Sequence, residues 1–211
     1  MDIPVMPDEN AGPDAGGTKA APVRLIGIIG AGQMGNGIAH VASLASYDVL
    51  VNDLSSEAFD KAMQTISRNM DRQVSKGVIT EDAKGAALER IAFADSFSGL
   101  SRCDMVIEAA TEDESVKRNI FAALCKELKP EAIIATNTSS ISVTRLASIT
   151  DRPERFIGMH FMNPVPLMEL VELIRGIATE DDTFETSRAF VHSLGKTTAV
   201  SEDFPAFIVN R

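Results

Sequence analysis

The stretch that decides the fold is Gly30-Ala31-Gly32-Gln33-Met34-Gly35, a G-x-G-x-x-G pattern. It follows an apolar, β-branched run at 23–29 and opens a segment with helical periodicity at 33–46. Such a pattern is weak alone, but between a strand and a helix it is typical of a dinucleotide-binding turn. We therefore expect this turn to bind the phosphates of a nucleotide cofactor; the alternative is a glycine-rich turn that binds no ligand.

Each glycine of the pattern has a separate physical task in this interpretation. Gly30 permits the tight turn, Gly32 lets the backbone approach a pyrophosphate, and Gly35 lets the helix pack closely on the strand. The start of the helix would offer N–H groups and the positive end of its dipole to the phosphates. We expect Gln33 and Met34, which follow in the first helical turn, to contact the cofactor as well.

Asp53 ends the next strand-like segment, 48–52, about 20 residues beyond the first glycine of the pattern. An acid at this place accepts hydrogen bonds from a ribose diol and repels a 2′-phosphate. No arginine stands among residues 54–56, which follow directly. The pattern therefore favours NAD over NADP. The alternative is that Asp53 caps the next helix, a role that Ser55 or Ser56 could also fill.

The rest of the chain alternates between strand-like and helix-like periodicity. This alternation predicts an α/β fold of the Rossmann type, a doubly wound, mostly parallel sheet with helices on both faces. We expect further helices at 56–76, 80–90, 114–128 and 181–194, and further strands at 91–94, 105–109, 132–136, 155–162, 168–174 and 197–201.

The two ends of the chain differ from its middle. Residues 1–22 are rich in Pro and Gly and poor in large apolar side chains, so we interpret them as a disordered N-terminal extension. Residues 23–204 are expected to form the NAD-binding Rossmann domain. Pro205 is a helix-start residue, and residues 205–211 are interpreted as the start of a truncated helical C-terminal domain.

Composition excludes several classes of function. The chain has 211 residues, is 45% apolar and carries a formal net charge of −10. Binding to nucleic acid or to an anionic membrane surface needs clustered Lys and Arg, so we expect neither. No apolar run approaches the roughly 20 residues of a membrane helix. Two cysteines make no disulfide framework, which predicts a reducing, cytoplasmic location. We expect no metal site.

His160 and Glu172 form the candidate catalytic pair. His160 stands at the carboxyl end of a predicted strand, where open α/β sheets bind their ligands. Alternation along residues 168–174 puts Glu172 on an apolar strand face, where a carboxylate needs a hydrogen-bond donor. The imidazole of His160 is the obvious candidate, and the pair would suit proton abstraction. A structural His–Glu pair is the alternative. We assign His40 and His192, which fall inside helices, to structure.

Ser139 belongs to another strand end, 135–140, that is crowded with hydroxyls and amides. One of these side chains is expected to cap the next helix. The others would then face a substrate oxygen, or serve no ligand at all.

From Val23 to Arg211 the chain resembles the 3-hydroxyacyl-CoA dehydrogenase family, particularly its bacterial 3-hydroxybutyryl-CoA members. Seven stretches carry the resemblance in this order: Ile28–Gly35, Val106–Ala110, Asn137–Ser140, His160–Pro166, Leu170–Glu172, Gly195–Lys196 and Pro205–Arg211.

The resemblance implies a role for each matching residue in catalysis. His160 matches the family's general base and Glu172 the acid that orients it. Ser139 and Asn210 match residues that hold the substrate's 3-oxygen or thioester. Asn163 matches a residue near the nicotinamide and the substrate, and Ser139 is also expected near the cofactor.

Further residues are implied at the ends of the two ligands. Glu112 and Lys117 match cofactor contacts on the loop after the fourth strand. Lys76 matches a lysine that meets the CoA nucleotide. For both lysines the alternative is a solvated helix face. A serine that some relatives use for CoA aligns with Asn69, so this chain departs from the family at that contact.

The implied function is the reversible, NAD-dependent oxidation of an L-3-hydroxyacyl-CoA, such as 3-hydroxybutyryl-CoA, to the 3-ketoacyl-CoA, in fatty-acid β-oxidation and butanoate metabolism. Family members continue into a helical domain that supplies a homodimer interface and part of the acyl-CoA cleft. We therefore expect this chain to bind NAD but to turn over poorly unless a partner restores the cleft.

Two other interpretations compete with this function. A β-hydroxyacid dehydrogenase shares the glycine loop, but its glycine-rich substrate loop does not follow Asn137, and His160 would have no role. An isolated NAD-binding module or fragment, with little activity on its own, is the non-enzymatic alternative.

Overall fold

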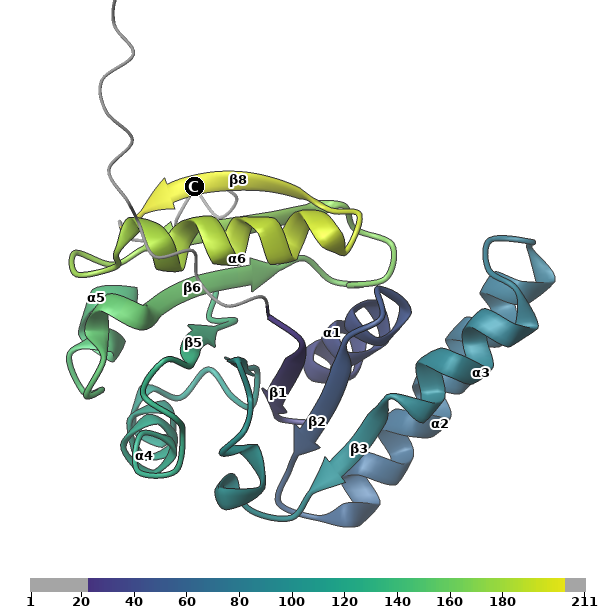
Figure 1. Ribbon diagram of the computed structural model, residues 1–211, viewed down its shortest axis with the longest axis horizontal. Coiled ribbons are helices and arrows are strands. Elements are labelled where there is room, and N and C mark those ends of the chain that lie inside the picture. The colour runs from purple at the N-terminus through teal and green to yellow at the C-terminus, as the bar shows by residue number, and fades with distance from the viewer. Residues whose placement is uncertain (1–22, 204–211) are drawn as a thin grey trace, which may run out of the picture.

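The structure is a computed structural model that describes residues 23–203. One sheet of eight strands runs through this part of the chain, in the order β3-β2-β1-β4-β5-β6-β7-β8 (Figure 1). The strands are β1 (Leu25–Ile29), β2 (Asp48–Asn52), β3 (Ile91–Ala94), β4 (Met105–Glu108), β5 (Ile133–Thr136), β6 (Phe156–Phe161), β7 (Leu170–Arg175) and β8 (Thr197–Glu202).

Strand direction follows the predicted, mostly parallel pattern. Neighbouring strands are parallel everywhere except at the β6–β7 pair, which is antiparallel. The chain builds outward from β1 in one direction through β2 and β3, and then in the other through β4. The carboxyl ends of β1 and β4 therefore form a topological switch point, where open α/β sheets bind ligands.

Helices cover both faces of the sheet, so the predicted Rossmann-type, doubly wound fold class is confirmed. One apolar core includes Ile38 and Phe190 from helices on one face, and the other includes Phe121 and Leu146 from helices on the opposite face. The helices are α1 (Gln33–Leu44), α2 (Ser56–Ser75), α3 (Glu81–Glu89), α4 (Glu114–Leu124), α5 (Val143–Ala147) and α6 (Asp181–Ser193), with short 3-10 turns at Phe97–Leu100 and Pro153–Arg155.

Helix α2 packs against the core of the domain through one apolar face. Its buried residues, Ala62, Ile66 and Met70, recur every four positions and so line one face of the helix. The Ser55 hydroxyl accepts a hydrogen bond from the Ala58 amide and caps the first turn. In Figure 1, α2 and α3 lie side by side and extend beyond the sheet. This helical pair gives the molecule an arm along which a long ligand could lie.

The predicted helix 114–128 is too long, because α4 ends at Leu124. The guanidinium of Arg152 donates hydrogen bonds to the carbonyls of Cys125, Leu128 and Lys129. These carbonyls are satisfied by a side chain that is distant in sequence, so a further helical turn is not needed.

The predictions for residues 1–22 and 205–211, including the one for Asn210, lie outside the described residues. Within the described range of 23–203, no helix is both long and apolar enough to cross a membrane.

Candidate active site

The glycine turn between β1 and α1 is built so that side chains are excluded at two of its positions. Gly30 has a φ of +100°, and a Cβ there would lie 2.7 Å from the Ala110 Cα. A Cβ on Gly35 would lie 1.7 Å from the Gly30 carbonyl oxygen. At Gly32, in contrast, a Cβ would meet no described atom within 4 Å. The turn is thus tight on the inside and open at Gly32, as a phosphate-binding backbone requires.

The start of α1 also suits an anionic ligand. Its N-cap is Gly32, which supplies no side-chain cap, and its first turn holds no acidic residue. Helices α2 to α5 each begin with a side-chain cap instead, from Ser55, Thr80, Asp113 and Ser142 respectively. The positive end of the α1 dipole is therefore not offset by the helix's own side chains, and these residues fit the pyrophosphate of a dinucleotide.

Asp53 supports this turn from the end of β2. Its Oδ2 accepts a hydrogen bond of 2.6 Å from the Ala31 amide, and its Oδ1 accepts one of 2.7 Å from the Leu54 amide. Ser55 caps α2, so the alternative interpretation of Asp53 as the helix cap is wrong. A carboxylate has about four acceptor sites, so two backbone bonds leave acceptor capacity for a ribose hydroxyl.

The predicted contact between His160 and Glu172 is present. The two residues are directly paired across the antiparallel strands β6 and β7. Nδ1 of His160 lies 2.7 Å from Oε2 of Glu172. Glu172 is fully buried and His160 is 9% exposed, so the carboxylate meets the ring away from water. An imidazole held in this way has a fixed orientation and tautomer.

A cavity of about 400 Å³ brings several of the predicted catalytic and cofactor residues together. It lies at the carboxyl ends of the strands around the β1–β4 switch point. Its walls include Met34, Glu112, Lys117, Ser139, His160 and Asn163. These residues come from α1, the β4–α4 loop, α4, the segment after β5, strand β6 and the segment after β6, and only the fold makes them neighbours.

Glu112 collects the hydroxyl groups that follow β5. Its Oε1 accepts hydrogen bonds from the Thr138 hydroxyl, the Ser139 amide and hydroxyl, and the Ser140 hydroxyl, at 2.7–3.1 Å. Burial acts to raise the pKa of Glu112, but the hydrogen bonds from Thr138 and Ser139, together with the charge of Lys117, outweigh it and lower the pKa. The prediction that a residue of 135–140 caps the next helix is wrong, because Ser142 caps α5. The serine hydroxyls are occupied with Glu112 instead.

Lys117 is not on a solvated helix face, so that alternative is wrong. Its side chain is 1% exposed, and its Nζ lies 2.5 Å from Oε2 of Glu108 and 3.9 Å from Oε2 of Glu112. Sequence analysis missed Glu108. Its signal was the one that revealed Glu172, a carboxylate within an otherwise apolar strand, here 105–109.

Residues 25–204 match the family model described as the NAD binding domain of 3-hydroxyacyl-CoA dehydrogenase. The chain belongs to this family. It is 66% identical over 192 residues to a 3-hydroxybutyryl-CoA dehydrogenase of Bradyrhizobium diazoefficiens, covering 91% of this chain and 66% of the relative. It is 46% identical to a probable 3-hydroxybutyryl-CoA dehydrogenase of Deinococcus radiodurans, covering 88% and 66% of the two chains.

The fold agrees with solved structures of the same family. The (S)-3-hydroxybutyryl-CoA dehydrogenase PaaH1 from Ralstonia eutropha superimposes with a TM-score of 0.88 at 45% identity, over 90% of this chain and 67% of that one. The chain thus spans 66% of the length of the two relatives named above, and smaller shares of longer relatives.

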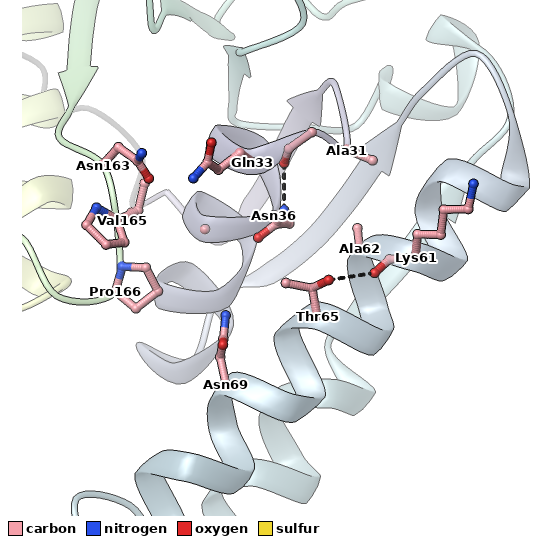
Figure 2. A pocket seen from close by; sticks show the side chains of 13 residues that line it. Ala31, Gln33, Asn36, Lys61, Ala62, Thr65, Asn69, Asn163, Val165 and Pro166 are labelled. Atoms are coloured by element: carbon pink, nitrogen blue, oxygen red, sulfur yellow. Dashed lines mark hydrogen bonds between the residues drawn. The ribbon is translucent and has the colours of Figure 1, made fainter.

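Two further cavities continue from the first one along helix α2. The nearer, of about 380 Å³, shares Asn163 with the cavity of His160. Figure 2 shows it between segment 163–166 and helix α2, with Gln33 and Asn36 of α1 in between. The farther, of about 560 Å³, contains Lys76 and shares Asn69 with the nearer one. Lys76 therefore does not line the cavity of His160, but a row of three cavities that share lining residues lies between the two side chains.

The remaining histidines contact neighbouring elements, which agrees with a structural assignment. His40 of α1 is buried, with Nε2 2.9 Å from Oε1 of Gln73 on α2. Nε2 of His192 lies 3.2 Å from the Thr198 hydroxyl. His40 also lines the cavity that contains Lys76, which sequence analysis did not anticipate.

Proposed function

We propose that this chain carries out the chemical half of an NAD-dependent 3-hydroxyacyl-CoA dehydrogenase. The reaction is the reversible oxidation of an L-3-hydroxyacyl-CoA, such as 3-hydroxybutyryl-CoA, to the 3-ketoacyl-CoA. The observation that carries the proposal is the buried His160–Glu172 pair, whose His160 lines one cavity with several of the predicted cofactor residues. A purely nucleotide-holding module has no need of such a pair.

The chain's own residues account for the proton in this reaction. Glu172 holds one ring nitrogen of His160, which orients the imidazole and stabilises it when it is protonated. In the oxidation His160 takes the proton of the 3-hydroxyl, and in the reduction it returns that proton. Bound NAD supplies the acceptor for the hydride that leaves C3. Ser139 and Asn210 are assigned to the oxygens of the substrate. The Ser139 hydroxyl donates its hydrogen to Glu112 and keeps acceptor capacity for the 3-hydroxyl of the substrate.

Residues around the glycine turn are assigned to the cofactor. Gly30, Gly32 and Gly35 shape the backbone for the pyrophosphate, and Gln33 and Met34 begin the helix that faces it. Asp53 accepts from the ribose, which favours NAD over NADP. A second group of proposed cofactor contacts lines the cavity of His160: Glu112, Lys117, Ser139 and Asn163.

The row of cavities supports a long substrate such as an acyl-CoA thioester. The row begins at the cavity of His160 and continues with the cavity lined by Asn163 and Asn69. It ends at the cavity lined by Arg72 and Lys76. Two cationic side chains at the far end suit the phosphates of the CoA nucleotide. We therefore assign Lys76 to the nucleotide end and His160 to the acyl end. A homodimer and a cytoplasmic location are further proposals; the two free thiols, Cys103 and Cys125, agree with a reducing compartment.

Two measurements test this function. NADH binding to the 211-residue chain, followed by fluorescence, tests the cofactor assignment. Turnover is tested by joining the 211-residue chain to the part of the Bradyrhizobium relative that this chain does not cover, and following NADH consumption with acetoacetyl-CoA. We expect the chimaera to be active and its His160→Ala variant to lose about 10²–10⁴-fold in turnover with NADH affinity retained. A His160→Ala variant as active as its parent chimaera would overturn the assignment of His160 as the base, and an inactive parent chimaera that binds NADH would leave only a nucleotide-binding module.

A further inference from the structure

Glu108 is a fully buried carboxylate that no catalytic or cofactor role described above uses. It is the last residue of β4, and both of its oxygens have partners. Oε1 accepts a hydrogen bond of 2.9 Å from the Ala110 amide. Oε2 accepts one of 2.5 Å from Nζ of Lys117 and one of 2.9 Å from the Thr136 hydroxyl. Glu108 thereby joins the β4–α4 loop, helix α4 and the end of β5.

A series of polar contacts leads from Glu108 to the cavity of His160. Lys117 lies between two carboxylates, 2.5 Å from Glu108 and 3.9 Å from Glu112. Glu112 in turn accepts hydrogen bonds from the amide and the hydroxyl of Ser139. Lys117, Glu112 and Ser139 line the cavity, whereas Glu108 is not among its lining residues. Glu108 can therefore affect the site only through the residues it holds.

Stability alone is a poor explanation for this ion pair. Burying two charges costs several kcal/mol each in desolvation, and apolar residues of similar volume often replace such pairs without loss of stability. Helix α4 already has an apolar anchor in Phe121 and Leu124, which are fully buried. A charged pair at this place is better explained by the ammonium group that it holds at the wall of the cavity.

We propose that Glu108 is a positioning residue of this active site, which fixes the Lys117 ammonium and thereby the Glu112–Ser139 contact. This inference rests on the proposed function, in which those residues meet the cofactor and the substrate. Without the Glu108 charge, Glu112 is the one anionic partner that the ammonium keeps among residues 23–203, and the ammonium moves toward it. Glu112 then exchanges hydrogen bonds from Thr138 and Ser139 for the ammonium, and the cavity wall changes shape.

The first test is NADH affinity of the 211-residue chain and its Glu108→Gln variant. We expect the dissociation constant to rise about tenfold, as the loss of a charge-assisted contact predicts. Thr136→Val is the matched control, since it removes the other side-chain hydrogen bond to the same Oε2 and leaves the ion pair. It should lower the melting temperature and keep NADH affinity within about twofold of the wild type.

A double-mutant cycle shows whether Glu108 acts through Lys117. We expect Lys117→Met to weaken NADH binding, and adding Glu108→Gln to it to cause no further loss. The double variant contains no unpaired buried charge, so it decides the question even if Glu108→Gln alone does not fold. A folded Glu108→Gln variant with wild-type affinity overturns the proposal. The proposal is also overturned if Lys117→Met binds NADH with wild-type affinity. It is overturned as well if adding Glu108→Gln to Lys117→Met weakens NADH binding as much as Glu108→Gln does alone.

A cofactor-free readout separates this inference from the proposed function. The amide resonance of Ser139, which reports its hydrogen bond to Glu112, should shift in Glu108→Gln and stay in place in Thr136→Val. If the wild-type chain binds no NADH, the cofactor assignment fails, and this resonance still tests the positioning role. An unchanged Ser139 resonance in folded Glu108→Gln overturns it.

Discussion

Nδ1 of His160 lies 2.7 Å from Oε2 of Glu172, and the two residues face each other directly across β6 and β7. The β6–β7 pair is antiparallel, whereas every other neighbouring pair in the sheet is parallel, and its register puts Glu172 opposite His160. The register of this strand pair thus gives the candidate base its carboxylate partner.

Glu172→Gln tests what that carboxylate contributes. The amide keeps the shape and can still accept from the ring, but it has no charge to stabilise a protonated imidazole. In the active chimaera we expect turnover to fall by about 10²–10³-fold, within the range of acid–base effects. NADH affinity, measured by fluorescence, should stay within about twofold of the wild type. Equal turnover in the two proteins would show that the pair is structural.

The glycine turn offers a matched pair of variants with opposite outcomes. Gly35→Ala would place a Cβ 1.7 Å from the Gly30 carbonyl, so we expect a lower melting temperature or no folded protein. Gly32 has a φ of −64° and open space at its Cβ position, so Gly32→Ala should fold normally. Its methyl group would point where the pyrophosphate approaches, and NADH affinity should fall by about tenfold or more. A Gly32→Ala variant that binds NADH normally would argue against a phosphate site at this turn.

His40 makes the stability of the domain depend on pH. Burial lowers the pKa of His40 below its usual 6.5, and the charge of Lys196 lowers it further, against the opposing effect of the hydrogen bond that Nε2 donates to Gln73. The unfolded chain therefore binds a proton at this residue at a higher pH than the folded chain does. The neutral His40 ring therefore contributes to the free energy of unfolding above pH 6.5, and this contribution is lost as the pH falls from 6.5 through the lowered pKa of the folded state.

The measurement is the melting temperature of wild type and His40→Gln between pH 7 and about pH 5. Gln keeps an N–H donor for Gln73 and does not titrate. We expect the melting temperature of the wild type to drop more steeply than that of the variant. If the melting temperatures of the two proteins fall equally with pH, His40 does not cause the pH dependence of stability in this range.

Lys196 holds the segment that walls the two cavities beyond Asn163. Its buried Nζ donates hydrogen bonds of 2.7 Å to the carbonyls of Val165 and Met168. Lys196→Met should destabilise the fold by about 1–3 kcal/mol, because both carbonyls lose their donor. Urea denaturation measures this loss. Lys126→Met, at an exposed lysine, is the control and should leave the unfolding free energy nearly unchanged. Equal stabilities of the two variants would contradict this role of Lys196.

Much of the architecture and of the site could be predicted from local pattern. The turn at Gly30–Gly35, the acid at Asp53 and the alternation of periods are constraints within short segments, and they are enough to predict a doubly wound sheet with a nucleotide-binding turn. A carboxylate on an apolar strand face marked Glu172 in the same way. Such features are readable because their physical cause lies within a few residues of each other.

The features of the site that local pattern could not predict depend on contacts between residues that are distant in the chain. The burial of Lys117 against Glu108, the four hydrogen bonds collected by Glu112 and the end of α4 under Arg152 follow from strand register and helix packing. No local pattern separates a buried lysine from a solvated one, since its partner is known only when β4, α4 and β5 meet. By itself, the sequence determined the class of fold and the turn that faces the cofactor. The tertiary structure alone decided which charges are paired around His160, because pairing is a property of three-dimensional neighbours.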